Sequence, residues 1–200
     1  KMVIKDVAGN RSTLQFWVKR GEVKDPSSKM FNYILPFDED KQIEKGALSL
    51  FLKKGTLYEN LYLKYNTSID KSKGVFSTVH EIQDYKTPVH RYFDIGIEAS
   101  GIPDNLRDKA FIAYCGKSKS PQNCGGKWKE GKLTAKVRDF GNYCIMVDTK
   151  APTIQSIRFK SNMRGASKMT FKVKENFKTA RNIDPFTYKV TVDGKWILVD

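Results

Sequence analysis

Histidine and cysteine are scarce in this 200-residue chain, which holds only two histidines and three cysteines. His90 and Asp94 have the HxxxD spacing that supplies two zinc ligands in several peptidases. No HxH or HExxH motif follows, and a catalytic zinc needs a third protein ligand. On a strand these two side chains would stand roughly 13 Å apart. The sequence therefore predicts no metal ligand, no cofactor and no catalytic residue in this chain.

Long apolar runs and nucleophile motifs are also missing. No segment approaches the roughly 20 consecutive apolar residues that span a bilayer, so no transmembrane segment is expected. Neither a GxSxG motif nor a phosphate-binding loop is present. The acidic run at residues 37–40 matches no calcium-loop spacing, and a solvated turn is expected there instead.

Basic residues outnumber acidic ones, and the formal net charge is +14. Such a balance favours anionic partners. The lysines are scattered along the chain rather than gathered in one block or on one helix, which argues against a nucleic-acid partner. The remaining anionic partners that charge favours are anionic lipid or lipopolysaccharide and acidic glycan.

The three cysteines leave the disulfide state open. They are Cys115, Cys124 and Cys144, and an odd count leaves at least one thiol unpaired within the chain. Cys115 and Cys124 flank a short loop, and a bridge between them would stabilise the fold by roughly 2–3 kcal/mol. That bridge requires an oxidising compartment. Three free thiols packed in strands are an equally good interpretation.

Hydrophobic residues recur with a period of two almost everywhere, which indicates strands with one buried face. A single helical turn is expected at 103–108. Asp193 and Gly194 form a strong hairpin signal between two such runs. The clearest expected strands are 48–52, 61–65, 93–97, 133–137 and 169–173.

Many short strands with regular turns predict an all-β chain of tandem immunoglobulin-like β-sandwiches. Residues 1–20 are expected to form the terminal hairpin of a preceding domain, with strands at Met2–Lys5 and 13–18. Residues 24–149 are expected to form one complete sandwich. Residues 152–200 are expected to form a further sandwich that stops in mid-strand at 198–200.

The segment Asp139-x-Gly141-x-Tyr143 resembles the tyrosine corner of immunoglobulin-like domains, in which a Tyr bonds backward to the backbone. The pattern predicts that Tyr143 and Ile145 face the core while Cys144 faces the opposite side of the sheet. Antibody domains place their bridging Cys two residues after the Tyr. Here Ile145 holds that position, so a disulfide of that type is not expected.

Trp128 is the best candidate for an exposed ring that stacks on sugars. It stands in a polar run between Lys127 and Lys129, and these three residues form the candidate contact for a glycan or another partner. Core and cross-strand packing is the expected role of most other aromatic residues.

Four segments of the chain have a family-specific sequence: residues 54–62 (KGTLYENLY), 103–114 (PDNLRDKAFIAY), 140–148 (FGNYCIMVD) and 193–198 (DGKWIL). Together they resemble the C-terminal, non-catalytic β-sandwich region of secreted lysostaphin-type zinc metallopeptidases, the peptidoglycan endopeptidases of Gram-negative bacteria. In that family a separate upstream domain carries the zinc, held by an HxxxD and an HxH motif. None of that machinery maps onto this chain.

The resemblance implies an accessory region that acts as a spacer and as a docking surface, with a cell-envelope protein, peptidoglycan or an anionic glycan as its partner. It implies secretion across the inner membrane and a periplasmic or outer-membrane location. Zinc is implied only for an upstream domain, so the parent protein is the candidate enzyme and this chain is not. Two alternatives stay open: a glycan-binding or adhesion module, and a structural subunit of an envelope assembly.

Overall fold

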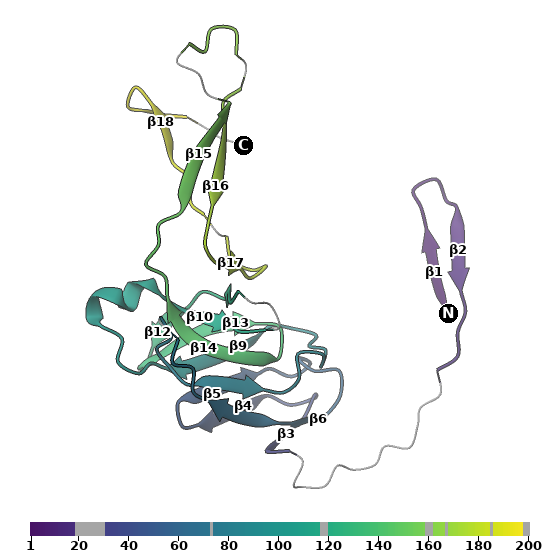
Figure 1. Ribbon diagram of the computed structural model, residues 1–200. Coiled ribbons are helices and arrows are strands. Elements are labelled where there is room, and N and C mark those ends of the chain that lie inside the picture. The colour runs from purple at the N-terminus through teal and green to yellow at the C-terminus, as the bar shows by residue number, and fades with distance from the viewer. Residues whose placement is uncertain are drawn as a thin grey trace.

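The computed structural model describes residues 1–18, 31–72, 74–116, 120–158, 162–166, 168–184 and 186–197. The chain is all-β, as predicted, and its strands form several sheets (Figure 1). The expected strand end at 198–200 and the expected boundary near residues 20–24 lie outside the described residues. A 3₁₀ helix, Asp104–Lys109, occupies the place of the expected helical turn.

The strands are short and follow one another closely. In chain order they are β1 (Met2–Lys5), β2 (Arg11–Leu14), β3 (Tyr33–Leu35), β4 (Lys41–Lys45), β5 (Leu48–Leu52), β6 (Leu61–Leu63), β7 (Tyr65–Ser68), β8 (Val79–Ile82), β9 (Phe93–Glu98), β10 (Ala110–Tyr114), β11 (Gln122–Asn123), β12 (Lys127–Lys129), β13 (Lys132–Val137), β14 (Gly141–Val147), β15 (Thr153–Arg158), β16 (Thr170–Lys174), β17 (Lys178–Thr179), β18 (Val190–Val192) and β19 (Lys195–Ile197).

Two sheets pack face to face around the central core. One has the strand order β12-β13-β9-β5-β4, and the other has the order β17-β11-β10-β14-β8-β7. The small pair β3-β6 adds Leu35 and Leu63 to the same core. Alternating apolar residues from both sheets meet in the core, as the period of two predicts. Leu50 and Ile95 reach it from the first sheet, and Ile112, Tyr143 and Ile145 reach it from the second.

The sequence predicts one strand over 61–65, but the structure has two. β6 pairs with β3, whereas β7 begins at Tyr65 and pairs with β8 in the six-stranded sheet. The chain thus changes sheets at Lys64, whose exposed side chain fits such a crossing. Alternation continues through a sheet change and does not reveal it.

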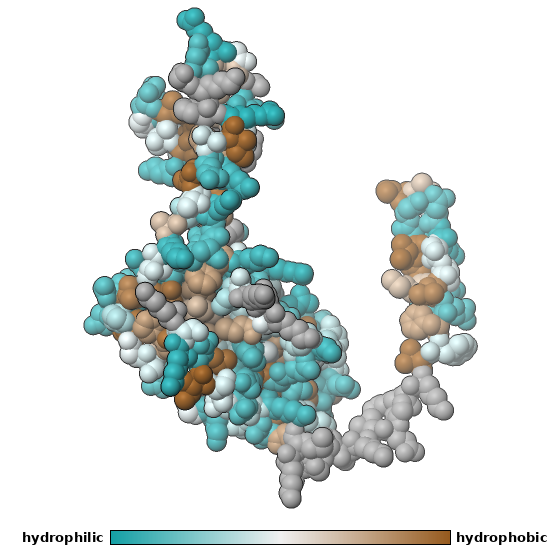
Figure 2. Space-filling view, viewed as in Figure 1, coloured by the Kyte–Doolittle hydropathy of each residue, from teal (hydrophilic) through white to brown (hydrophobic). Residues whose placement is uncertain are grey.

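The N-terminal hairpin, β1 and β2, is held by a turn that Asp6 closes. The Asp6 carboxylate accepts hydrogen bonds from the backbone N–H and the side-chain amide of Asn10, both at 2.8 Å. All residues of the two strands are exposed, and Figure 2 shows hydrophobic side chains along the hairpin. Phe16 and Trp17, placed in a strand by the sequence, follow the end of β2.

The C-terminal region contributes to the central unit as well as forming its own hairpins, β15-β16 and β18-β19. Asp193 and Gly194 join the second hairpin with positive φ angles of 50° and 77°, as the turn signal predicts. β17, although it lies within 152–200, pairs in parallel with β11 and ends the six-stranded sheet. The Ala180 N–H then donates to the Asn123 carbonyl at 2.8 Å.

A second, smaller cluster lies on the outer face of the six-stranded sheet. Phe111, Ala113 and Cys144 are buried there, and Phe177 from the C-terminal region packs against them. The rings of Phe111 and Phe177 lie 4.9 Å apart. Cys144 does face away from Tyr143, as predicted, but this side of the sheet is covered rather than open to water at that point.

Candidate functional site

Three polar side chains stand in one row across the outer face of the six-stranded sheet. Asn66 of β7 pairs with Glu81 of β8, and Glu81 pairs with Asn142 of β14. The Cys115 N–H, just after β10, donates to the Asn142 carbonyl at 2.8 Å. Directly opposed residues point to the same face of a sheet. The three side chains therefore lie side by side at one end of the sheet.

A cavity of about 680 Å³ lies at this end of the sheet, and it is lined by this row together with Tyr65 and Tyr114 from the opposite face. Four aromatic side chains line it, together with amide and charged groups, and we call it the aromatic groove. Its lining includes Phe31, Asn32, Lys64, Tyr65, Asn66, Glu81, Gln83, Asp84, Tyr85, Tyr114, Cys115, Gly116, Gly141 and Asn142. Aromatic walls with a few polar groups are typical of ligand-binding sites.

Two glycines set the position of Tyr114 in the groove wall. A Cβ added to Gly116 or to Gly141 would lie only 2.7 Å from the Tyr114 ring. Gly141 also has φ of 139°, which side-chain-bearing residues rarely adopt. The Tyr114 ring therefore lies across backbone that only glycine can provide, and its hydroxyl donates to the Phe140 carbonyl at 3.4 Å.

Side-chain amides fix the wall formed by β7 and the chain after β8. The Asn32 carbonyl oxygen accepts the Tyr65 N–H at 2.6 Å, and the Gln83 side chain accepts the Lys64 N–H at 2.9 Å. The Gln83 N–H donates in return to the Lys64 carbonyl at 2.8 Å. Gln83 holds a positive φ of 55° in this arrangement. These hydrogen bonds within the chain thus fix the shape of this wall of the groove.

His80 lies on the inner face of the sheet, where it stabilises the fold. It is buried, and its two ring nitrogens face the Tyr65 hydroxyl at 2.9 Å and the Thr78 hydroxyl at 3.3 Å. Burial lowers the pKa of His80 from 6.5 to about 4. The ring is therefore neutral at pH 7.

A second cavity, of about 570 Å³, adjoins the aromatic groove, and we call it the basic hollow. Tyr85 and Tyr114 line both cavities, so the two share a wall. Lys136, Arg138 and Arg181 line the hollow together with Asp139, so its cationic groups outnumber its carboxylates. Arg181 comes from the C-terminal region, where the neighbouring Asn182 amide donates to the Lys136 carbonyl at 3.3 Å.

The predicted glycan contact lies elsewhere, on β12 at the edge of the five-stranded sheet. Trp128 is half-buried, its indole N–H donates to the Arg107 carbonyl at 3.0 Å, and the Arg107 guanidinium lies 4.2 Å from the ring centroid. This contact is a cation–π interaction and covers one face of the ring. Lys127 is exposed, and Lys129 lies 3.9 Å from Glu130. These residues do not line the aromatic groove.

The Tyr143 hydroxyl donates a hydrogen bond to the Asp139 carbonyl at 2.5 Å. This bond runs backward over four residues, which is the geometry of a tyrosine corner. Burial raises the pKa of the Tyr143 hydroxyl, so that it remains a donor across the physiological range. Gly141 lies between the two partners at the first position of β14 and lines the aromatic groove.

Cys115 and Cys124, the candidate disulfide pair, are not bonded and lie on opposite faces of the sheet. Cys124 belongs to the main core, whereas Cys115 packs with the outer cluster. The alternation of side chains along β10 causes this separation, because Cys124 bonds to the Ile112 backbone and Cys115 lies three residues further on. All three cysteines, each within the described residues, are free thiols.

His90 and Asp94 engage different partners. His90 Nδ1 lies 3.2 Å from the Gly55 carbonyl, and Asp94 accepts from Lys136 at 2.8 Å. In the acidic run, Asp40 accepts the Lys54 N–H at 2.7 Å. Across the described ranges, no three His, Cys, Asp or Glu side chains gather closely enough to hold a metal ion.

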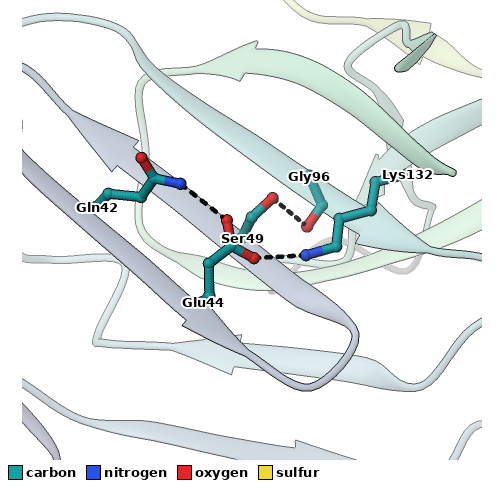
Figure 3. A network of polar contacts seen from close by, with 5 residues as sticks. All are labelled: Gln42, Glu44, Ser49, Gly96 and Lys132. Atoms are coloured by element: carbon teal, nitrogen blue, oxygen red, sulfur yellow. Dashed lines mark hydrogen bonds and ion pairs between the residues drawn. The ribbon is translucent and has the colours of Figure 1, made fainter. Parts of the chain in front are cut away.

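The outer face of the five-stranded sheet carries its own polar network (Figure 3). Glu44 lies between Lys132, at 2.6 Å, and the Gln42 amide, which donates to it at 3.1 Å. Hydrogen bonding from Lys132 lowers the pKa of Glu44. The Ser49 hydroxyl donates to the Gly96 carbonyl at 3.4 Å. These groups satisfy one another, so the network ties strands together and leaves the aromatic groove as the better candidate site.

Sequence reasoning did not find the aromatic groove. Asn66, Glu81 and Asn142 occupy the polar positions of alternating strands, and such positions are typical of any solvated sheet face. The one signal was the pair Gly116 and Gly141 beside Tyr114, because glycine marks places where another group approaches the backbone.

A model of the Zu5-like domain family matches residues 32–148, which are the residues of the two central sheets up to the end of β14. The match covers more than half of the chain, and the chain therefore belongs to the Zu5-like domain family. No curated protein and no solved structure matches it. Among the described residues no helix is long and apolar enough to cross a membrane.

Proposed function

We propose that this chain is a non-catalytic docking region of a larger cell-envelope protein, and that it binds peptidoglycan in the aromatic groove. The observation that carries the proposal is the groove itself: aromatic rings, amides and carboxylates converge over a sheet end whose shape is fixed by hydrogen bonds. Such preorganisation lowers the cost of ordering on binding.

The chemistry of the two cavities fits a polymer with two kinds of group. Aromatic faces suit the apolar faces of sugar rings, and the amides of Asn66 and Asn142 suit hydroxyl and acetamido groups. The basic hollow suits the carboxylates of peptide stems, because Arg138 and Arg181 line it. Peptidoglycan carries both groups side by side.

The parent is proposed to resemble the lysostaphin-type peptidoglycan endopeptidases of Gram-negative bacteria, with zinc and catalysis in an upstream domain. The architecture is proposed to be a tandem of immunoglobulin-like sandwiches, supported by the bond between Tyr143 and Asp139. The proposed location is the periplasm or the outer membrane, after secretion across the inner membrane. In that setting the docking region holds the parent on its polymer.

Co-sedimentation with purified peptidoglycan tests the proposal. The wild-type chain should sediment with the polymer, and Tyr85→Ala should weaken the affinity about three- to tenfold, as expected for one lost aromatic contact. Tyr58→Ala is the matched control, because Tyr58 is 60% exposed and does not line the groove. Binding that survives Tyr85→Ala but is lost with Trp128→Ala would transfer the site to β12. Absence of binding by the wild-type chain would reject the proposal.

The exposed apolar side chains of the N-terminal hairpin support a second candidate function, contact with another protein of the envelope. Val7 and Trp17 are almost fully exposed, and Ile4 and Leu14 are more than half exposed. Apolar patches of this kind mark protein interaction sites. Ultracentrifugation tests this candidate on the chain with and without residues 1–18. Envelope extracts at graded salt concentrations are added, and the comparison distinguishes a protein contact from a polymer contact.

A further inference from the structure

Two of the three thiols lie in contact on the outer face of the six-stranded sheet. The sulfurs of Cys115 and Cys144 are 3.4 Å apart. Cys144 stands in β14 opposite Ala113 of β10. Cys115 comes two residues after Ala113, directly after the end of β10, so its side chain lies on the same face of the sheet as Cys144. Tyr114, which precedes Cys115 and pairs with Tyr143, points to the other face. The pair is a product of strand register and not of sequence proximity.

We propose that Cys115 and Cys144 form an intramolecular disulfide by exchange with a disulfide oxidant, such as an oxidised low-molecular-weight thiol. A disulfide bond is about 2.05 Å long, so the sulfurs need to approach by roughly 1.4 Å. Cys115 lies just beyond the last residue of β10. Cys124 has no place in this reaction, because it lies on the other face.

The two thiols differ in a way that assigns the order of the reaction. Cys115 is half-buried and lines the aromatic groove, whereas Cys144 is fully buried. The hydrogen bond between them lowers the pKa of Cys115, and that bond together with burial raises the pKa of Cys144. The thiolate is the attacking species, and it must reach the oxidant. Cys115 meets both conditions.

The exchange balances in two steps. The Cys115 thiolate attacks one sulfur of the oxidant and forms a mixed disulfide with it. The S–S bond of the oxidant breaks, and its other sulfur takes up the proton from Cys115 and leaves as one equivalent of small thiol. The Cys144 sulfur then loses its proton and attacks the Cys115 sulfur, which releases the second small thiol. Two protein thiols are oxidised to one disulfide, and one oxidant disulfide is reduced to two thiols.

Peptide mapping of the full chain tests this proposal. Trypsin places each cysteine in a different peptide: residues 110–117, 120–127 and 139–150. After incubation with oxidised glutathione, non-reducing mass spectrometry should find 110–117 linked to 139–150 and a free thiol in 120–127. A link between 110–117 and 120–127, a stable glutathione adduct on Cys115, or three unmodified thiols would each overturn the proposal.

Three variants separate the roles of the thiols. Cys144→Ala should stop the reaction at a glutathione adduct on Cys115, since the second step has no nucleophile. Cys115→Ala should leave Cys144 unmodified, because that thiol is buried. Cys124→Ala is the control and should form the disulfide as the wild type does. Circular dichroism of each variant confirms that it is folded. Disulfide formation that is lost equally in Cys124→Ala would contradict the assignment.

Discussion

At the scale of single residues, His80 couples the stability of the fold to pH. Its ring is buried between the hydroxyls of Tyr65 and Thr78, and its pKa falls from 6.5 to about 4 in the folded state. Between these values the unfolded chain binds more protons than the folded one, so stability is complete above pH 6.5 and falls as the pH falls toward 4. The expected loss by pH 4 is about 3 kcal/mol.

Urea unfolding between pH 7 and pH 4 measures this loss. His80→Gln is the matched variant, since its amide can retain hydrogen bonds to the two hydroxyls without titrating. The difference in stability between wild type and variant should shrink as the pH falls. A difference that stays constant over this range would show that His80 does not titrate there.

Tyr143 gives a second prediction at this scale. Tyr143→Phe removes the hydrogen bond to the Asp139 carbonyl without creating a cavity, and should lower the free energy of unfolding by about 1 kcal/mol with an unchanged m-value. Tyr114→Phe is the control, because its bond to the Phe140 carbonyl is longer, at 3.4 Å. An equal or larger loss for Tyr114→Phe would contradict the ranking.

The sequence predicted the residues of the tyrosine corner but not the partner of Cys115. A backward bond over four residues is local, so the pattern around Tyr143 carries it. Contact between Cys115 and Cys144 depends on the register of β10 against β14, which a single sequence does not specify. Proximity along the chain favoured Cys124 as the disulfide partner of Cys115. The alternation of side chains places Cys124 on the face opposite Cys115.

At the scale of elements, Gly96 permits the close approach of β5 and β9. A Cβ at Gly96 would lie 2.3 Å from the Ser49 hydroxyl oxygen and 3.3 Å from the Thr134 methyl group. Gly96→Ala should therefore destabilise the fold by about 1–2 kcal/mol. Ser49→Ala removes the clashing atom, so the double variant should recover about 1 kcal/mol of that loss. Denaturation of the four proteins of this cycle measures the coupling, and strictly additive losses would contradict it.

Phe177 joins the C-terminal region to the central unit. Its ring packs against Phe111 at 4.9 Å and covers the outer cluster. Phe177→Ala should cost about 2 kcal/mol of stability, a reduced value for a half-buried ring. It should also speed alkylation of Cys144, which it helps to cover. Phe37→Ala, at an exposed ring, is the control and should change stability by less than about 0.5 kcal/mol. Unchanged stability for Phe177→Ala would mean that the C-terminal region packs loosely.

Element positions were predictable where one face of a strand is buried. The alternation of β5, β9 and β13 and the turn at Asp193 and Gly194 all follow from local pattern. The sheet change at Lys64 and the parallel pairing of β17 with β11 do not, because both depend on contacts between distant segments.

At the scale of the whole molecule, the aromatic groove is made by residues from five separate stretches of the chain, and no one stretch contains a recognisable site. The sequence pointed to Trp128 because that ring stands in a polar run. The structure engages that ring with Arg107, while Asn66, Glu81 and Asn142 come together only when their strands align. The fold thus brings polar positions that are ordinary on a solvated sheet face together in one site.

The central claim is that the aromatic groove binds peptidoglycan, and mapping of amide chemical shifts on the isotope-labelled chain tests it most directly. A soluble fragment with both sugar and peptide stem should shift the resonances of Asn66, Glu81, Tyr85 and Asn142 together. The shifts should extend to Arg138 in the basic hollow. Shifts confined to Lys127, Trp128 and Lys129, or no shifts at saturating fragment, would contradict the claim.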